Sequence, residues 1–230
     1  MTRGWIRWTG ALGLALLAVG TWIGLVVAPA ELHMGDVQRI MYVHVPSAWI
    51  ALLCFTAAFV FAVVSLWSGR RAWDDRLVGA VEVGVVLNAL LLVQGSIWGR
   101  ATWGVWWDWD VRLTTSLVML LLFAGVLALR RLAEDEGRRA RWSAVATIIA
   151  FVDVPLVYFC VRWWRSLHQI QSSPETVDAA MTLPLRINAA GMLLLAIWMI
   201  SRRARIERAR RAAEEIAPPP RLAAEEPARA

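Results

Sequence analysis

Four tryptophans lie within seven positions of the stretch WGVWWDWDVRLTTS, which covers residues 103–116. These indoles belong to Trp103, Trp106, Trp107 and Trp109. Indole faces stack on other flat π-systems, so the cluster favours a large planar ligand such as a porphyrin. If residues 103–110 formed a helix, the first three indoles and Asp110 would share an arc of roughly 100° along the membrane surface.

An aromatic belt at the membrane–water interface is the simpler explanation for these rings. In that interpretation, Asp110 only caps the helix that follows it. One or two tryptophans are enough for a belt, however, and four adjacent ones are not explained by it. The stretch therefore favours a binding platform over an anchor.

Three histidines, His33, His44 and His168, are the candidates for iron ligands, since haem needs axial imidazoles. His44 lies in RIMYVHVPSAW, two residues before Pro46, which can open a helix at its first turn and hold the imidazole at the surface. His168 lies in VRWWRSLHQIQSS, close to two further tryptophans. His33 has no aromatic neighbours and is interpreted as a solvated residue.

Haem also needs cations for its propionates. The arginines close in sequence to these motifs are Arg39, Arg100, Arg112 and Arg165. Each arginine alone is as well explained by a contact with lipid headgroups. Together with the histidines and tryptophans they predict a site for a planar cofactor.

Other chemistries find no support in the sequence. The two cysteines, Cys54 and Cys160, form neither C-x-x-C nor C-x-x-C-H, which argues against a dithiol oxidoreductase and against a c-type cytochrome. Both are expected to be buried apolar thiols. There is no Walker A sequence and no acidic metal cluster.

The elements that must position the site are transmembrane helices. Hydrophobic residues make up 59% of the 230 residues, and mean hydropathy is +0.53, above the range of soluble domains. A helix needs about 20 apolar residues to cross the bilayer core. Six stretches qualify and predict an all-α, polytopic membrane protein: 10–28, 47–67, 77–98, 113–129, 142–161 and 183–200.

The arginines predict the orientation of these helices. All 24 basic residues are arginines, and with both termini in the cytoplasm only six lie on or near the outer side: Arg39, Arg100, Arg112, Arg162, Arg165 and Arg186. The other 18 then lie inside, as the positive-inside rule requires. The net charge of +6 is thus a topology signal, and no nucleic-acid partner is expected. All three histidines and the tryptophan stretch fall on the outer face.

The chain divides into a six-helix domain over 1–200 and a basic, partly disordered cytoplasmic tail over 201–230, whose first half could extend the last helix. The first apolar segment imitates a signal peptide ending in Ala28-Pro29-Ala30, but it is longer than the usual core of about 7–15 residues. An uncleaved helix is therefore predicted.

Three polar residues within the predicted spans are not explained by a planar-cofactor site. Asp153 precedes Pro155 in the fifth span, and Glu82 and Asn88 lie in the third. Such groups are functional by default. They could bond each other or a neighbouring backbone, or they could form a proton or haem path.

The stretch WGVWWDWDVRLTTS closely resembles the tryptophan-rich WWD signature of haem-handling proteins in cytochrome c maturation. The flanking RIMYVHVPSAW and WWRSLHQ are similar to those of the CcmC family, haem exporter protein C. The resemblance extends over about residues 30 to 200 and includes the order histidine, WWD, histidine.

The resemblance implies that haem b is the ligand, with His44 and His168 as axial ligands. It further implies a haem platform and two arginines for the propionates, formed by Trp103, Trp106, Trp107, Trp109, Asp110, Arg39 and Arg112. The family holds haem at the periplasmic face of the bacterial inner membrane and passes it to the chaperone CcmE. It works beside the ABC transporter subunits CcmA and CcmB and the small subunit CcmD, and is not classed as an enzyme, although a role in forming the haem–chaperone bond is open.

Three alternatives remain. A haem–apocytochrome c synthetase of the same superfamily would be larger, with more helices and histidines. A proton-coupled solute carrier using Glu82 and Asp153 would show internal repeats and matched broken helices, which are not seen. A purely structural membrane subunit would have no use for the tryptophan stretch.

Overall fold

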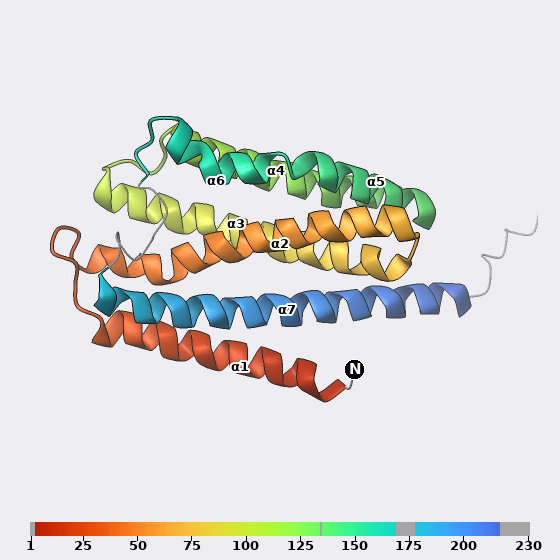
Figure 1. Ribbon diagram of the computed structural model, residues 1–230, viewed down its shortest axis with the longest axis horizontal. Helices are drawn as coiled ribbons and strands as arrows, with labels where there is room; N and C mark the ends of the chain where they lie inside the picture. Colours follow the sequence, from red (N-terminus) through yellow and green to blue (C-terminus); the bar gives the residue numbers. More distant parts are fainter. Residues whose placement is uncertain (1–2, 134, 169–177, 217–230) are drawn as a thin grey trace, which may run out of the picture.

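The computed structural model describes residues 3–133, 135–168 and 178–216, and no strand occurs within these ranges. The helices run side by side along one axis (Figure 1). In chain order the structure contains α1 (Arg3–Trp22), a π-helical turn η1 (Ile23–Val27), a 3₁₀ turn η2 (Asp36–Ile40), α2 (Met41–Ser68), α3 (Arg71–Thr102), α4 (Val111–Leu132), α5 (Glu136–Ala150), α6 (Asp153–Trp163) and α7 (Ala179–Ile216).

Six segments of these described ranges are long and apolar enough to cross a membrane, which confirms the predicted number. They are Gly4–Val27, Asp36–Ser68, Arg71–Thr102, Val111–Leu132, Glu136–Trp163 and Ala180–Ala213. The predicted spans are shorter than these segments, by up to 11 residues at the start of the second and 13 at the end of the sixth, and only the first was predicted to end later, by one residue. α1 begins and α7 ends at the same end of the bundle, as an even number of crossings requires (Figure 1).

The bundle is layered, with α2 and α3 in the middle, α1 and α7 on one side and α4, α5 and α6 on the other (Figure 1). Stacked rings join the middle layer to the outer one, since Phe55 of α2 and Phe123 of α4 have ring centroids 3.8 Å apart. On the other side, α1 and α7 meet at Gly13 and Gly191. A Cβ at either glycine would come within 2.9 Å of the facing backbone, so only glycine allows this close approach.

Pro46 lies inside α2, whereas the sequence interpretation placed it at the first turn of the helix. The helix begins five residues earlier because α7 compensates for the missing amide. Proline frees the carbonyl four residues before it, here that of Tyr42. The Nδ2 of Asn188 donates to that oxygen at 2.9 Å. Inside a bilayer such a replacement partner is what makes an internal proline tolerable.

The fifth span is broken. α5 ends at Ala150 and α6 begins at Asp153, two residues before Pro155. The Phe151 carbonyl nonetheless accepts from the Val154 amide at 3.0 Å, so the proline leaves no exposed carbonyl there. The Asp153 carboxyl is buried, and its Oδ2 has no hydrogen-bond partner among the described residues.

The other two polar residues of the spans have separate partners. Asn88 donates to the Ser116 carbonyl at 3.0 Å, and Glu82 pairs with Arg203 at 2.6 Å. Asn88 thus bonds a neighbouring backbone, as one of the predicted possibilities required. The described contacts do not join Glu82, Asn88 and Asp153 to one another.

Candidate functional site

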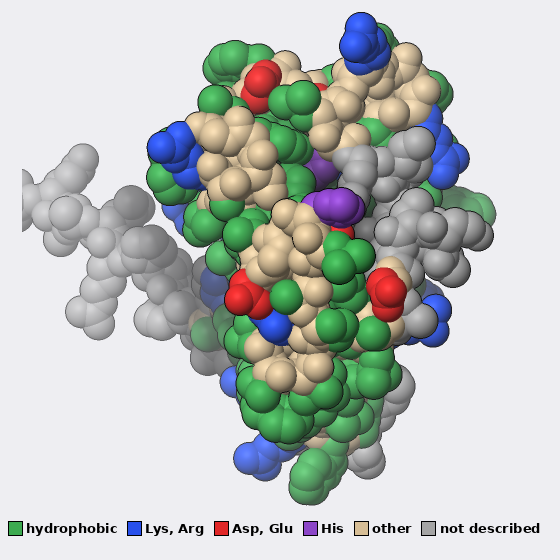
Figure 2. All heavy atoms as spheres, turned by 90° about the vertical axis from the view of Figure 1, so that its left-hand side faces the viewer, with side chains coloured by type: hydrophobic (Ala, Val, Ile, Leu, Met, Phe, Trp, Pro, Cys, Tyr) green, Lys and Arg blue, Asp and Glu red, His purple; other side chains and the backbone are tan. Residues whose placement is uncertain are grey.

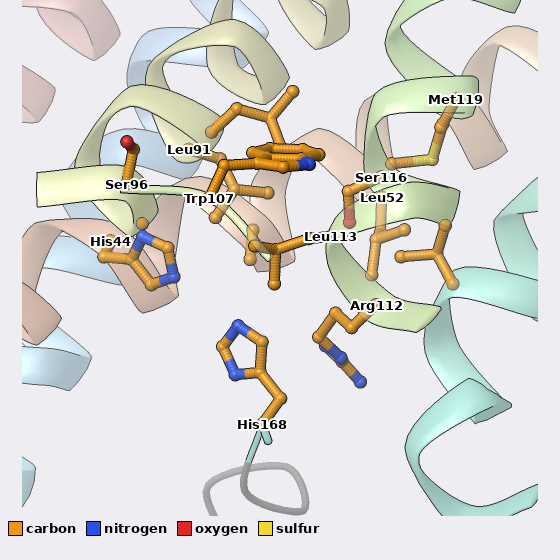
Figure 3. A pocket seen from close by; sticks show the side chains of 14 residues that line it. His44, Leu52, Leu91, Ser96, Trp107, Arg112, Leu113, Ser116, Met119 and His168 are labelled. Atoms are coloured by element: carbon orange, nitrogen blue, oxygen red, sulfur yellow. The ribbon is translucent and has the colours of Figure 1, made fainter. Parts of the chain in front are cut away.

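Both candidate axial histidines line one cavity, at the end of the bundle where α2, α3 and α4 meet the chain after α6 (Figure 3). His44 comes from α2 and His168 from the turn after α6, and both rings face the same opening (Figure 3). The apolar wall of this cavity, called here the histidine cavity, includes Leu52, Leu91, Leu113 and Met119. The bundle thus brings together two imidazoles that lie far apart in the sequence.

His44 is fixed by its place inside α2. Its side chain is buried and packs against α3 at Gly95, where an added Cβ would come within 3.1 Å of the imidazole Cε1. The Nδ1 atom has no hydrogen-bond partner among the described residues. A buried polar atom without a partner usually has an explanation in function or in a bound group, and iron ligation would supply one.

Asp110 fixes the turn that carries His168. The Asp110 carboxylate accepts hydrogen bonds from the Ser166 hydroxyl at 3.0 Å and from the Leu167 amide at 2.8 Å. The Ser166 oxygen in turn accepts from the His168 amide at 3.0 Å. Asp110 also accepts from the Arg112 amide at 2.8 Å and so caps α4, as the simpler interpretation of the sequence predicted.

Two tryptophans surround the His168 imidazole. Trp98 lies parallel to it, with an interplanar angle of 10° and centroids 6.4 Å apart, and Trp103 meets it edge-on at 5.6 Å. Burial, assisted by the Arg112 cation and opposed by the Asp110 carboxylate, lowers the pKa of His168 to about 4. The imidazole is therefore neutral at physiological pH, which is the form that binds iron.

The tryptophan stretch is not helical. The expectation that its indoles share a single face of a helix is therefore wrong. α3 ends at Thr102, α4 begins at Val111, and the chain between them is irregular, with Gly104 at a φ of +79°. The indoles consequently spread over different environments. Trp107 lines the histidine cavity, whereas Trp106 and Trp109 are 60% and 75% exposed.

The two exposed tryptophans of the stretch, Trp106 and Trp109, still contact neighbouring residues. The Trp106 carbonyl accepts from the Ser96 hydroxyl of α3 at 2.7 Å, and the Trp109 ring meets Trp107 edge-on at 5.7 Å. The surface at this end of the molecule carries histidine near its centre among hydrophobic side chains (Figure 2). This surface also carries acidic and basic side chains (Figure 2), and its exposed hydrophobic residues include Trp106 and Trp109.

The two arginines predicted for propionates have different places. Arg112 lines the histidine cavity beside His168 (Figure 3), and its Nε has no partner among the described residues. Arg39 does not line it. Its guanidinium donates to the carbonyls of Gly24 and Ala28 at 2.6 and 3.0 Å and pairs with Asp36 at 2.8 Å, so it holds the end of the first span.

His33 is exposed, lies in the loop before η2 and does not line the histidine cavity. Trp98 was not among the predicted site residues, although it contacts His168 through stacking. Its position as the last residue of the predicted third span, at the outer membrane boundary, was the signal that could have identified it.

The histidine cavity has a volume of about 60 Å³, room for a few water molecules and far too little for a porphyrin. Its residues nevertheless suit haem in kind: two imidazoles, an arginine, indoles and apolar side chains. Two of the lining residues, Trp107 and His168, lie in the non-helical segments 103–110 and 164–168. A porphyrin between the imidazoles would need more room than the cavity has in this structure.

Comparisons with known proteins show the family of the chain. A family model described as "Heme exporter protein C" matches residues 1–217. The chain is 35% identical to heme exporter protein C of Escherichia coli K12, with 88% of this chain and 83% of that protein covered. It is 33% identical to the protein of the same name from Bradyrhizobium diazoefficiens, covering 84% and 75% respectively. A putative ccmC-like mitochondrial protein for cytochrome c biosynthesis in Marchantia polymorpha is 29% identical over 78% of both chains.

Proposed function

The chain belongs to the haem exporter protein C family, CcmC, of cytochrome c maturation, and from this we propose that it holds haem b at the histidine cavity and delivers it to the chaperone CcmE. Haem is the cargo of this protein. The proposal depends on the observation that His44 and His168 line one cavity. In the sequence these two histidines lie before and after the tryptophan stretch. Imidazole is a strong iron ligand, and a pair of them gives a six-coordinate, low-spin haem.

The remaining site residues have distinct roles in this proposal. Arg112 faces the cavity and is placed to pair with a propionate. Trp107, Trp103 and Trp98 provide aromatic surface around the imidazoles, while the exposed Trp106 and Trp109 are available both to the ring of haem and to the chaperone. Asp110 acts as a positioning residue, because it holds the turn of His168.

Arg39 has a different role in this proposal from the one that the resemblance implied. Its guanidinium is held by two carbonyls and by Asp36, which leaves it engaged in the fold. It stabilises the connection between η1 and η2, from which α2 and His44 follow. These bonds use its Nε and Nη1 atoms, so a contact with a propionate would have to be made by Nη2.

The proposal places the chain in the bacterial inner membrane with both termini in the cytoplasm and the histidine cavity at the periplasmic face. The arginine distribution supports this orientation. Reporter fusions after residues 35 and 105 should show periplasmic activity, and fusions after 72 and 136 should not. Periplasmic activity of the fusion at 136 would contradict the scheme.

The partners follow from the same family. We propose that the chain works with the ABC transporter subunits CcmA and CcmB and with the small subunit CcmD, and acts as a delivery factor. A synthetase that joins haem to apocytochrome thiols is the second candidate. The described residues offer only two histidines at one cavity, which favours delivery.

A visible absorption spectrum of the purified protein tests the proposed function. With haem alone it should show low-spin bands, and added CcmE should remove haem from it in proportion to the chaperone. A protein that binds no haem, or that transfers it to apocytochrome c and not to CcmE, would contradict the proposal.

A further inference from the structure

A second cavity opens at the opposite end of the bundle, between α3, α4 and α7, with α5 at its edge. It has a volume of about 650 Å³, about ten times that of the histidine cavity. One part of its wall is apolar and is formed by Val78, Val85, Val86 and Leu127. The other part carries five arginines and two glutamates, so the cavity, called here the arginine cavity, is amphipathic and net positive.

Three of the five arginines are engaged by carboxylates. Arg130 forms two hydrogen bonds with Asp74, at 2.8 and 2.7 Å. Arg203 lies between Glu82 and Glu207, at 2.6 and 2.7 Å. Arg210 pairs with Glu207 at 2.9 Å and with Glu136 at 3.1 Å. These ion pairs join α3, α4, α5 and α7 and form a rigid base for the cavity.

The other two arginines have no carboxylate partner among the described residues. Arg139 donates only to the Ala133 carbonyl, at 3.1 and 3.2 Å. Arg131 is exposed at the end of α4 and makes no described hydrogen bond or ion pair. Two guanidiniums at one rim, each with free donors, form a receptor for an oxyanion with several oxygens, such as a phosphate.

The depth of the cavity indicates what carries that phosphate. Arg130 of the last turn of α4 contacts Asp74 of α3, which fixes the level of the charged rim. Val86 lies twelve residues further along α3, and a helix rises about 1.5 Å per residue, so the apolar wall extends about 18 Å from that level. Half of the bilayer core is about 15 Å thick. The cavity therefore matches a headgroup at the rim and an acyl chain along the wall.

We propose that the arginine cavity binds an anionic phospholipid, with its phosphate on Arg131 and Arg139 and one acyl chain along Val85, Val86 and Leu127. The lipid belongs to the leaflet at the arginine-rich end, opposite the histidine cavity. A soluble phosphate compound would leave the apolar wall without an occupant. A polar segment of another protein would have to enter the depth of the hydrocarbon core. The inference is independent of haem, and its failure would leave the proposed function unaffected.

The test compares two double variants that remove the same charge from the same end of the bundle. Arg131→Gln with Arg139→Gln alters the rim, whereas Arg138→Gln with Arg141→Gln alters two exposed arginines of α5 that do not line the cavity. Each protein is purified in mild detergent, and retained phosphatidylglycerol is measured by mass spectrometry. Melting temperatures are recorded in nanodiscs of phosphatidylcholine with and without phosphatidylglycerol.

The wild-type protein and the control variant should retain phosphatidylglycerol and melt at a higher temperature in its presence. The rim variant should lose retention by about fivefold for each guanidinium removed, keep its low-spin haem spectrum and show no melting difference. Equal losses in both double variants would overturn the proposal, because they would reflect general charge attraction. Equal stabilisation by soluble glycerol phosphate, or an acidic segment of another protein found in the cavity, would also overturn it.

Discussion

The carboxylate of Asp110 and the amide of Leu167 lie 2.8 Å apart and join the start of α4 to the turn that carries His168. The same carboxylate caps α4 and accepts from Ser166, whose oxygen accepts from the His168 amide. One buried acid therefore couples the tryptophan stretch to the second imidazole. It explains how a turn without regular structure can hold a ligand in a defined place.

Replacing Asp110 with Ala should reduce low-spin haem by at least about tenfold, because one hydrogen bond to a charged group contributes about 1.5–3 kcal/mol and three are lost. Asp110→Asn should lose less, since its amide oxygen still accepts. Added imidazole should partly restore the low-spin bands in both variants. The matched control is Asp108→Ala, an exposed acid two residues away. Equal losses at both positions would show that the charge of the stretch matters and the turn does not.

The two candidate axial ligands should respond differently from the third histidine. His44→Ala or His168→Ala should give a five-coordinate spectrum or lose haem, and added imidazole should partly restore the low-spin bands. His33→Ala should leave the spectrum unchanged, because His33 is exposed and does not line the cavity. Loss of haem in the His33 variant alone would refute the assignment.

The sequence predicted the helices, their number and the end of the bundle at which the histidines lie, because hydropathy and arginine positions are local signals. It did not predict how the stretch 103–110 is folded. A conformation without repeating hydrogen bonds depends on tertiary contacts such as that of Ser96 with the Trp106 carbonyl. No periodic pattern records those contacts.

Two residues show the same limit. The family resemblance grouped Asp110 with the haem platform, yet its partners on the turn after α6 become neighbours only in the folded bundle. Trp98 was not predicted because its contact with His168, a residue 70 positions later, exists only in the folded bundle. In both cases the residue type was informative, and the role depended on packing between distant segments.

The tryptophans should differ in their effect on haem retention. Trp107→Ala should weaken it more than Trp106→Ala, because only Trp107 lines the cavity, and Trp98→Ala should weaken it through the orientation of His168. An aromatic contact contributes about 0.5–1.5 kcal/mol beyond area burial, so each loss should be partial. Trp198→Ala, in α7 against Gly10, is the control. The same effect from all four variants, measured by haem titration, would favour an anchoring belt.

Truncation tests the last part of α7, which lies beyond the predicted end of the sixth span at residue 200. A cut after residue 205 removes Glu207, Arg210 and Arg211, which pair with α4, α5 and α3 respectively. Removing one partner of a buried ion pair costs about 3–5 kcal/mol, which corresponds to a melting temperature lower by about 6–20 °C. A cut after residue 216 keeps these pairs and should leave the melting temperature unchanged. If the protein cut after residue 216 lost the low-spin spectrum, the removed residues 217–230 would contribute to haem binding.

The acid titration of His168 should depend on Arg112. In the folded protein the pKa of His168 is lowered to about 4 from an ordinary value of 6.5, with the Arg112 cation as one cause. The unfolded chain therefore binds the proton first, and the free energy of unfolding should fall as pH drops from 6.5 to 4. Arg112→Gln should raise the pH midpoint of the His168 imidazole titration, which can be followed by NMR in haem-free protein. The free energy of unfolding of this variant should also fall less between pH 6.5 and 4. Arg165→Gln, an exposed neighbour in sequence, should leave the midpoint near 4. A wild-type midpoint at 6.5 would mean that the imidazole is not buried among Trp98, Trp103 and Arg112.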